Sequence, residues 1–308
     1  MEPVKPFLKW VGGKTQIIKE VIGLFPTEMN NYYEPFVGGG SVLLALLSSV
    51  QQGTIQVSGH IFASDVNLNL IVLYENVQKE VEALITAVRA LTTEFATCTG
   101  TVVNRAPNTL AEAKTSRESY YYWIRKRFNA LDMGERSTVA ASAMFLFLNK
   151  TCFRGLWREG PHGFNVPYGN YKNPAIIDET HIRTVSDLIK DVVFVCERFT
   201  DCVSSCSAGD FVYLDPPYAP ENHTSFVDYV AGGFSLENHT RLFELCGELR
   251  QKGAELLMSN ADVEVVKNAF PAEEFDVKKI SCRRAINSVA PSSRTMELLI
   301  KSRPFSGQ

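Results

Sequence analysis

The sequence predicts an α/β fold in which a mainly helical insert interrupts the sheet. Apolar runs of strand length, bounded by turn residues, alternate with helical patterns near both ends of the chain, whereas helical patterns follow one another in the middle. A chain of 308 residues with 45% hydrophobic content is also long enough to bury a large core. These observations indicate one large domain with an insertion, or two smaller domains.

The first half of the chain begins the sheet and then becomes helical. Strands are expected at residues 32–36 and 55–64, with an apolar helix at residues 41–50 between them. Three more helices are expected after them, at residues 69–92, 116–131 and 137–149. Residues 93–115 are rich in Thr, Ala and Asn and indicate a long surface loop.

The last part of the chain resumes the alternation. One helix is expected at residues 235–252, among strands at residues 192–199, 211–214 and 254–259 and near positions 275 and 297. We therefore assign residues 1–69 and 191–308 to one α/β domain, and residues 70–190 to a domain inserted into it.

Composition and cysteine usage exclude several classes of protein. Because no apolar stretch reaches transmembrane length and the N-terminus lacks the apolar region of a signal peptide, we expect an intracellular protein that does not enter a membrane. Seven cysteines without a C-x-x-C pair fit reduced thiols. Cys196, Cys202 and Cys206 are clustered but lack the spacing of metal ligands, so no metal site is expected.

The charge distribution is uneven, although the net charge is only −3. Basic residues outnumber acidic ones from residue 120 to 172 and again from residue 278 onward. Two basic segments on either side of the segment around Asp215 are suited to binding a phosphate backbone. Ordinary solvent-exposed faces of a protein can have the same charge pattern.

The first chemical motif follows the apolar run at residues 211–214. It consists of Asp215, Pro216, Pro217 and Tyr218. An exocyclic amine of a nucleobase is a poor nucleophile, because its lone pair is delocalised into the ring. The Asp215 carboxylate and the Pro216 carbonyl could each accept one of its N–H groups, while Tyr218 stacks on the base. The alternative is a proline turn with a capping aspartate and a core tyrosine.

The second motif is a glycine-rich turn between the first strand and helix. It contains Glu34, Phe36, Gly38 and Gly40, and it indicates a nucleotide-type pocket at the carboxyl end of the sheet. Leu43 stands where a dinucleotide fingerprint requires glycine, so the F-x-G-x-G form points to an adenosyl cofactor.

Asp65 ends the next expected strand. A carboxylate there can accept both ribose hydroxyls of a nucleoside, or it can act as a cap or turn residue within Ser64-Asp65-Val66-Asn67.

The third motif lies near the N-terminus and imitates a phosphate-binding loop. Leu8 stands where that loop requires glycine, and no apolar strand precedes it. Trp10 and Lys14 would instead offer a ring to pack on a cofactor and a cation for its carboxylate. Taken alone, the tryptophan could belong to the core and the lysine to the surface.

Five motifs in order, LKWVGGK, YYEPFVGGG, SDVN, FNVPYGNYKNP and DPPY, resemble the Dam and DpnII type DNA adenine-N6 methyltransferases, the alpha group or D12 class. The resemblance covers nearly the whole chain. It implies a Rossmann-like S-adenosylmethionine-dependent methyltransferase sheet with an inserted helical and β-hairpin DNA-recognition domain.

The resemblance also implies roles for residues. In this family S-adenosylmethionine is the cofactor, and double-stranded DNA is the substrate. The cofactor would contact or be enclosed by residues of four motifs, namely Trp10, Lys14, Glu34, Phe36, Gly38, Gly40, Asp65 and Asp215. Asp215, Pro216, Pro217 and Tyr218 would hold a flipped adenine for transfer to N6.

The segment 149–174 resembles the family's DNA-recognising hairpin. Arg158 matches an arginine that reads guanine, and Phe153 matches an aromatic that wedges into the duplex. Other expected DNA contacts are Arg154, Asn165, Pro167, Tyr171 and, near the C-terminus, Arg294. Because Arg154 and Trp157 depart from the Dam pattern, the target is expected to be GATC or a related short site. Hairpin packing and phosphate contacts remain the alternative for these side chains.

The motifs bear on three other functions. Cytosine-C5 methylation is excluded because the chain has no Pro-Cys dipeptide to supply its nucleophile. Cytosine-N4 methylation presents the same amine chemistry and stays open, as does a DNA- or cofactor-sensing protein without catalysis. A restriction endonuclease would be a functional rather than a physical partner, and we expect a monomer or a weak dimer.

Overall fold

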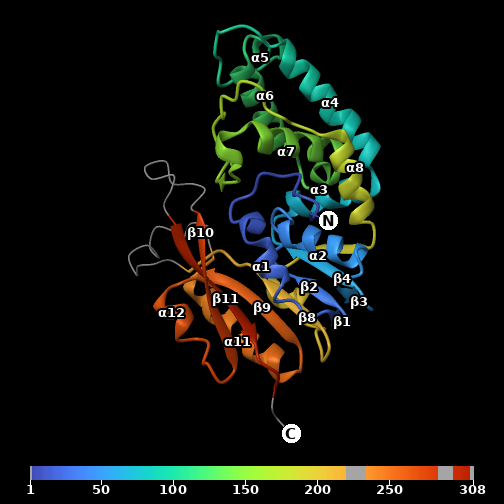
Figure 1. The fold of residues 1–308 in the computed structure, drawn as a ribbon. Helices are drawn as coiled ribbons and strands as arrows, with labels where there is room; N and C mark the ends of the chain where they lie inside the picture. Colours follow the sequence, from blue (N-terminus) through green and yellow to red (C-terminus); the bar gives the residue numbers. More distant parts are fainter. Residues whose placement is uncertain (1, 220–233, 284–293, 306–308) are drawn as a thin grey trace.

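The computed structural model describes residues 2–219, 234–283 and 294–305, and its central feature is a mixed sheet of seven strands (Figure 1). The strand order is β10-β11-β9-β8-β2-β4-β7. The parallel strands are β2 (Tyr32–Glu34), β4 (Ile61–Asp65), β7 (Val192–Cys196), β8 (Phe211–Leu214) and β9 (Glu255–Ala261). Antiparallel strands β11 (Arg294–Ser302) and β10 (Phe275–Arg283) complete one side. The predicted α/β fold is confirmed.

The two central strands carry apolar residues on both faces, as strands covered by helices on both sides do. All residues of β2 and β8 are buried. Tyr32, Phe211 and Tyr213 pack into one core with α2 (Ser41–Gln51), and Tyr33 and Val212 pack into the other. The second core includes residues of three helices, α9 (Phe199–Cys202), α11 (Leu236–Gln251) and α12 (Glu264–Lys267).

Six helices lie between β4 and β7. They are α3 (Leu68–Lys79), α4 (Val81–Thr97), α5 (Leu110–Ala113), α6 (Arg117–Asn129), α7 (Val139–Thr151) and α8 (Glu179–Leu188). Helices α4 to α7 gather at one end of the molecule, apart from the sheet (Figure 1). Nearly every residue of α7 is buried, because this helix has neighbours on all sides. No helix within the described residues is long and apolar enough to cross a membrane.

Polar caps explain where several of these helices begin. The side chains of Asn67, Thr138 and Asp178 accept a backbone N–H from the first turn of α3, α7 and α8. Short 3₁₀ turns supply connections, namely η1 (Lys14–Gln16) ahead of α1 (Ile18–Ile22), η2 (Glu135–Ser137) and η3 (Phe153–Gly155).

Three predicted elements were wrong in extent. The expected strand at residues 192–199 ends at Cys196, and Phe199 begins α9. Residues 69–92 do not form one helix, because the chain leaves helical geometry at Glu80 (φ −132°) between α3 and α4. Residues 55–64 form two strands: β3 (Gln56–Val57) pairs with β1 (Glu28–Met29), whereas β4 pairs with β2. Gly59 lies between these strands, and a Cβ there would come within 2.3 Å of the Asn31 side chain.

The predicted loop at residues 93–115 is shorter than expected. Helix α4 continues to Thr97, and α5 occupies part of the remainder. Packing stabilises helical structure in this segment although its residues have only moderate helix propensity, because Phe95 and Ala113 are buried.

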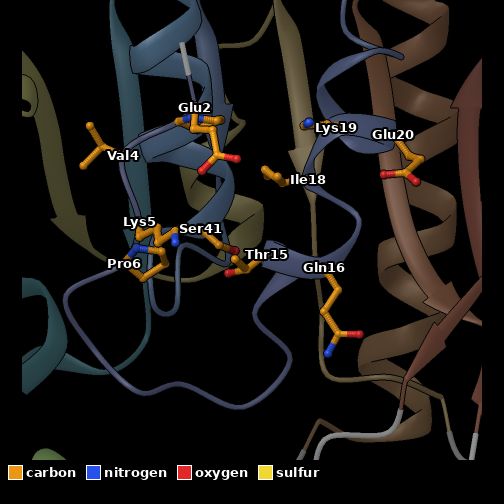
Figure 2. A pocket seen from close by; sticks show the side chains of 11 residues that line it. Glu2, Val4, Lys5, Pro6, Thr15, Gln16, Ile18, Lys19, Glu20 and Ser41 are labelled. Atoms are coloured by element: carbon orange, nitrogen blue, oxygen red, sulfur yellow. The ribbon is translucent and has the colours of Figure 1, made fainter.

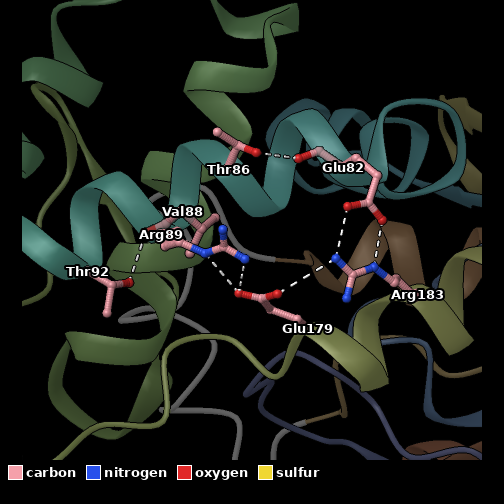
Figure 3. Close-up of polar contacts among 7 residues, drawn as sticks. All are labelled: Glu82, Thr86, Val88, Arg89, Thr92, Glu179 and Arg183. Carbon is pink, nitrogen blue, oxygen red and sulfur yellow. Dashed lines mark hydrogen bonds and ion pairs between the residues drawn. The ribbon is translucent and has the colours of Figure 1, made fainter.

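An ion-pair cluster joins α4 to α8, which returns the chain from the helices toward β7 (Figure 3). Arg183 donates two hydrogen bonds to Glu82, at 2.6 and 2.9 Å. Arg89 lies 2.6 Å from Glu179, which also faces Arg183 at 3.7 Å. Because these side chains are largely exposed, we assign the cluster an orienting role and little stabilisation.

Candidate active site

The catalytic motif predicted after β8 lies against the N-terminal arm. Asp215 follows directly on the carboxyl end of β8, and its carboxylate lies 2.7 Å from the Lys14 ammonium. Lys14 is almost fully buried, and it donates a second hydrogen bond to the Gly12 carbonyl at 2.7 Å. Its backbone N–H is fixed on Ser41 Oγ at the start of α2. Segments 200 residues apart in sequence are thereby joined by one buried ion pair.

Tyr218 completes this cluster. The Lys14 ammonium lies 4.9 Å from the centre of the Tyr218 ring. The Tyr218 hydroxyl donates a hydrogen bond of 2.8 Å to Glu297, in β11. Pro216 is buried and Pro217 is exposed, so the two prolines stiffen the chain between the ion pair and the ring.

Two carboxyl groups at neighbouring strand ends have different environments. Burial raises the pKa of Asp215, and the Lys14 ammonium beside it opposes that rise. Glu34, at the end of β2, is buried and accepts a 2.7 Å hydrogen bond from the Tyr32 hydroxyl. Burial raises the pKa of Glu34 to about 8, the hydrogen bond opposes the rise, and the charge of Asp215 adds to it. Asp215 has a cationic partner, whereas Glu34 is held by a neutral donor.

The glycine-rich turn packs tightly against two aromatic side chains. Gly38 (φ 47°) and Gly40 (φ 72°) have left-handed backbone geometry. A Cβ at Gly38 would come within 2.9 Å of the Trp10 ring, and one at Gly40 within 2.6 Å of the Tyr74 hydroxyl. That hydroxyl donates to the Gly38 carbonyl at 3.0 Å.

Asp65 braces the same turn from β4. One of its carboxylate oxygens accepts the Gly38 N–H at 3.2 Å, and the other accepts the Asn67 N–H at 3.0 Å. The side chain that caps α3 belongs to Asn67, so Asp65 is not the helix cap. Burial raises the pKa of Asp65, and these N–H groups oppose the rise.

The remaining predicted cofactor residues are aromatic. Phe36 packs on Phe199 with ring centres 5.5 Å apart, and Phe234 meets it edge-on at 5.7 Å. Trp10 lies over the glycine turn and is stacked on Phe145 at 6.4 Å. The carboxylates of Asp65 and Asp215, flanked by aromatic rings, have the chemistry that suits a nucleoside carrying a positive sulfonium.

The predicted DNA hairpin is present as a short β-ribbon. Strand β5 (Glu159–Gly160) pairs with β6 (Gly163–Phe164). Arg158 is exposed beside it, and its guanidinium donates a 2.7 Å hydrogen bond to the Asn165 side chain. Trp157, by contrast, stacks on Phe164 at 4.5 Å and contacts Phe145 at 4.3 Å, so it belongs to the core.

The segment that leads into the hairpin presents Phe153 to solvent, with 43% of its surface exposed. Its backbone N–H is fixed on the Pro167 carbonyl at 2.8 Å. Arg154 has left-handed backbone geometry (φ 58°), its guanidinium lies 5.1 Å from the Phe153 ring centre, and its N–H donates to the Tyr171 hydroxyl. Six of the seven predicted DNA residues therefore gather around this hairpin. Five of these six are exposed, namely Phe153, Arg154, Arg158, Asn165 and Pro167.

One predicted DNA contact cannot be described. Arg294 begins β11, but its side chain and residues 284–293 before it lie outside the described residues.

Three residues at the site were missed by the sequence reasoning. The Lys9 ammonium lies 4.1 Å from the centre of the Tyr171 ring, and the Lys9 backbone is tied to the Asn149 side chain, which accepts its N–H and donates to its carbonyl. Glu297 and Asn260 reach the catalytic motif from β11 and β9. Lys9 adjoins Trp10 in the N-terminal motif, so the sequence could have indicated it as a site residue. The contacts of Glu297 and Asn260 depend on strand register, which the sequence does not reveal.

A separate cavity of about 470 Å³ lies beside the N-terminal arm (Figure 2). Residues 2–6 form one side, and residues of η1 and α1 form the other, with Ser41 between them. Its walls mix Lys5 and Lys19 with Glu2 and Glu20, and none of the predicted cofactor residues lines it.

The described residues contain no group of three or more metal-ligating side chains. The cysteines are all unpaired, and Cys202 and Cys206 are buried.

Comparison with known proteins agrees with this geometry. Residues 10–286 match the family described as D12 class N6 adenine-specific DNA methyltransferase. A type II methyltransferase of Methanocaldococcus jannaschii, M.MjaIII, is 38% identical over 92% of this chain and 93% of its own length. The DNA adenine methylase of Serratia marcescens is 31% identical over 97% and 98%, and that of Escherichia coli K12 is 30% identical over 97% and 95%. The chain belongs to the D12 class of N6 adenine-specific DNA methyltransferases.

Proposed function

We propose that this adenine-specific DNA methyltransferase acts on a flipped adenine within GATC or a related short site of duplex DNA, with S-adenosylmethionine as the methyl donor. The observation that carries the proposal is the cluster of Asp215, Lys14 and Tyr218 at the carboxyl edge of the sheet, next to the glycine turn. Ligands of open α/β sheets bind at that edge.

The proposed cofactor residues are those around the glycine turn, namely Trp10, Lys14, Glu34, Phe36, Gly38, Gly40, Asp65 and Asp215. Asp65 has the position and the carboxylate needed to accept ribose hydroxyls. Bound there, S-adenosylmethionine would supply a methyl group on an electrophilic sulfonium. The Asp215 carboxylate contacts Lys14, which is bonded to Ser41 after the glycine turn and also lies near the Tyr218 ring, and this supports a role of Asp215 toward both cofactor and base.

The residues of the motif then activate the amine. The Asp215 carboxylate accepts one N6–H and the Pro216 carbonyl accepts the other, which localises the nitrogen lone pair in line with the methyl group. Tyr218 stacks on the adenine, and Pro217 keeps the ring in place. Formation of the N–C bond would break the bond between the methyl group and the sulfonium sulfur and leave S-adenosylhomocysteine, and the surplus N6 proton would pass to Asp215 or to water. No covalent enzyme intermediate is needed.

Site recognition is assigned to the inserted residues 70–190, and catalysis to residues 1–69 and 191–308. We propose that Arg158 reads a guanine and that Phe153 enters the duplex, because both side chains are exposed beside the hairpin. Arg154, Asn165, Pro167, Tyr171 and Arg294 are proposed as further DNA contacts. Two relatives are named type II methyltransferases, which supports a restriction endonuclease as a functional partner. The enzyme itself is proposed to be a monomer or a weak dimer.

Sequencing of modified bases in DNA from cells that express the protein tests this proposal. We expect N6-methyladenine at one short motif that contains GATC or differs from it at few positions, and none in cells that express Asp215→Asn. Methylation at an unrelated motif would overturn the proposed target, and methyl on cytosine N4 would overturn the proposed base.

A further inference from the structure

Two hydrogen bonds fix Tyr218, one at the hydroxyl of its ring and one at the backbone that follows it. Its hydroxyl donates to the Glu297 carboxylate at 2.8 Å. The N–H of Ala219, the next residue, donates to Asn260 Oδ1 at 3.1 Å. Because β11 pairs with β9 so that Glu297 lies opposite Ala261 and Leu298 opposite Asn260, both contacts come from adjacent strands.

These two contacts fix the plane of the ring. A tyrosine side chain has two rotatable bonds, so a fixed backbone and a fixed hydroxyl leave its ring one orientation. Asn260 is fully buried, and the same oxygen also accepts the N–H of Ala261 at 2.8 Å, which orients its amide. On the ring face, the Lys14 ammonium defines the side toward Asp215.

The charge of Glu297 works against ionisation of Asp215. Glu297 raises the pKa of Asp215, although the proposed chemistry needs Asp215 ionised. It also adds to the burial that raises the pKa of the Cys282 thiol to about 11. An acceptor oxygen is what the Tyr218 hydroxyl needs from this position, and a neutral acceptor would supply it without the charge.

We propose that Glu297 is a positioning residue for the target adenine: by accepting the Tyr218 hydroxyl, and with Asn260 fixing the following backbone, it sets the plane of the ring before the flipped base arrives. The inference rests on the proposed stacking of Tyr218 on the base. A correctly oriented platform raises the rate of transfer, because small misplacements of a bound base are costly.

Four variants test it in the full-length protein. Glu297→Gln keeps an acceptor oxygen, Glu297→Leu removes it, and Tyr218→Phe removes the donor while Glu297 stays. The double variant Glu297→Leu/Tyr218→Phe measures coupling. Glu255→Leu, which removes a half-exposed carboxylate from β9, is the matched control. The measurements are kcat, the KM for DNA, S-adenosylmethionine affinity, and fluorescence of 2-aminopurine at the target position.

We expect Glu297→Leu and Tyr218→Phe each to lower kcat about tenfold or more, with altered 2-aminopurine fluorescence and unchanged cofactor affinity. The double variant should be no slower than either single variant, and Glu297→Gln should stay within about threefold of the wild type.

Several results would overturn the inference. They are a Glu297→Leu enzyme as active as Glu255→Leu, additive losses in the double variant, or a Glu297→Gln enzyme as slow as Glu297→Leu. If Glu297→Leu does not fold, Tyr218→Phe decides alone, because full activity in that variant contradicts the positioning role. Failure of the wild-type enzyme to produce N6-methyladenine would instead overturn the proposed function together with this inference.

Discussion

At the scale of single residues, two nearby carboxyl groups have partners of different charge. Asp215 is paired with the buried Lys14 ammonium at 2.7 Å, which favours its ionised form. Glu34 is buried and bonded to the neutral Tyr32 hydroxyl, and its pKa is raised to about 8. One carboxylate can therefore accept a proton from an amine while its neighbour adds little negative charge.

Glu34 should make the stability of the protein depend on pH. Its folded pKa of about 8 lies above the unfolded value near 4.5, so between these values the native state binds more protons and stability falls as pH rises. Between pH 5 and pH 8 we expect the free energy of unfolding of the wild type to fall by on the order of 3 kcal/mol. This fall should be absent in Glu34→Gln. Urea unfolding at both pH values measures this.

A surface carboxylate provides the control for that experiment. Glu255→Gln changes a half-exposed group on β9 and should keep the wild-type pH dependence. Equal pH dependence in Glu34→Gln and wild type would mean that Glu34 is ionised in the folded protein at neutral pH.

At the scale of elements, neighbouring residues in the hairpin have separate roles. The Trp157 ring stacks on Phe164 and contacts Phe145, whereas Arg158 is exposed and bonded to Asn165. The departure of Trp157 from the Dam pattern is thus explained by packing. The neighbouring residue, Arg158, presents the planar guanidinium to which the proposed function assigns the reading of a guanine.

This difference predicts opposite effects of two substitutions. Trp157→Ala should lower the free energy of unfolding by about 3 kcal/mol, because it leaves a cavity between aromatic rings. Arg158→Ala should leave stability nearly unchanged and lower discrimination at one base pair by about 1–3 kcal/mol. Denaturant unfolding and methylation of substrates with single base-pair changes measure the two effects. A uniform loss for Arg158→Ala over all substrates would indicate a phosphate contact instead.

The glycine turn allows a similar comparison. Gly40 (φ 72°) and Gly53 (φ 69°) have similar geometry, but only at Gly40 would a Cβ meet another group, the Tyr74 hydroxyl. Each change to alanine should cost about 1 kcal/mol in stability through its backbone. Only Gly40→Ala should also weaken S-adenosylmethionine binding, which isothermal titration measures. Equal cofactor affinity in both variants would contradict the role of this turn.

Elements with one strong local signal were predictable from sequence. Strand β8 was predicted to the residue, because an apolar run bounded by turn residues fits a strand buried on both faces. The break at Glu80 was missed, since apolar spacing continues through it on both sides. Asp215, Asp65 and the glycine turn converge because each lies at the carboxyl end of a parallel strand. Glu297 and Asn260 could not be predicted, because their contacts depend on the register between β9 and β11.

At the scale of the whole molecule, the sheet order brings distant motifs together. Strand β8 lies beside β2, so the aspartate after it meets the arm and the glycine turn. The helices between β4 and β7 carry the hairpin, and the N-terminal arm contacts that hairpin through Lys9 and Tyr171. The N-terminal arm therefore contacts both the hairpin, through Lys9, and the motif after β8, through Lys14.

DNA binding by a protein with a net charge of −3 must come from local basic residues. We expect affinity for duplex DNA to fall with salt while S-adenosylmethionine affinity changes little. Arg294→Ala should weaken binding to all sequences equally. It should also reduce the slope of log affinity against log salt concentration by about one. Fluorescence anisotropy across a salt series measures this, and loss restricted to one sequence would contradict a phosphate contact.

The most direct test of the account is nucleoside mass spectrometry of duplex DNA after incubation with the purified protein and isotope-labelled S-adenosylmethionine. We predict labelled N6-methyladenine with the wild type and at least a hundredfold less with Asp215→Asn, which keeps the shape of the side chain and removes its charge. Label on cytosine, or an Asp215→Asn enzyme as active as the wild type, would contradict the central claim that Asp215 activates the adenine amine.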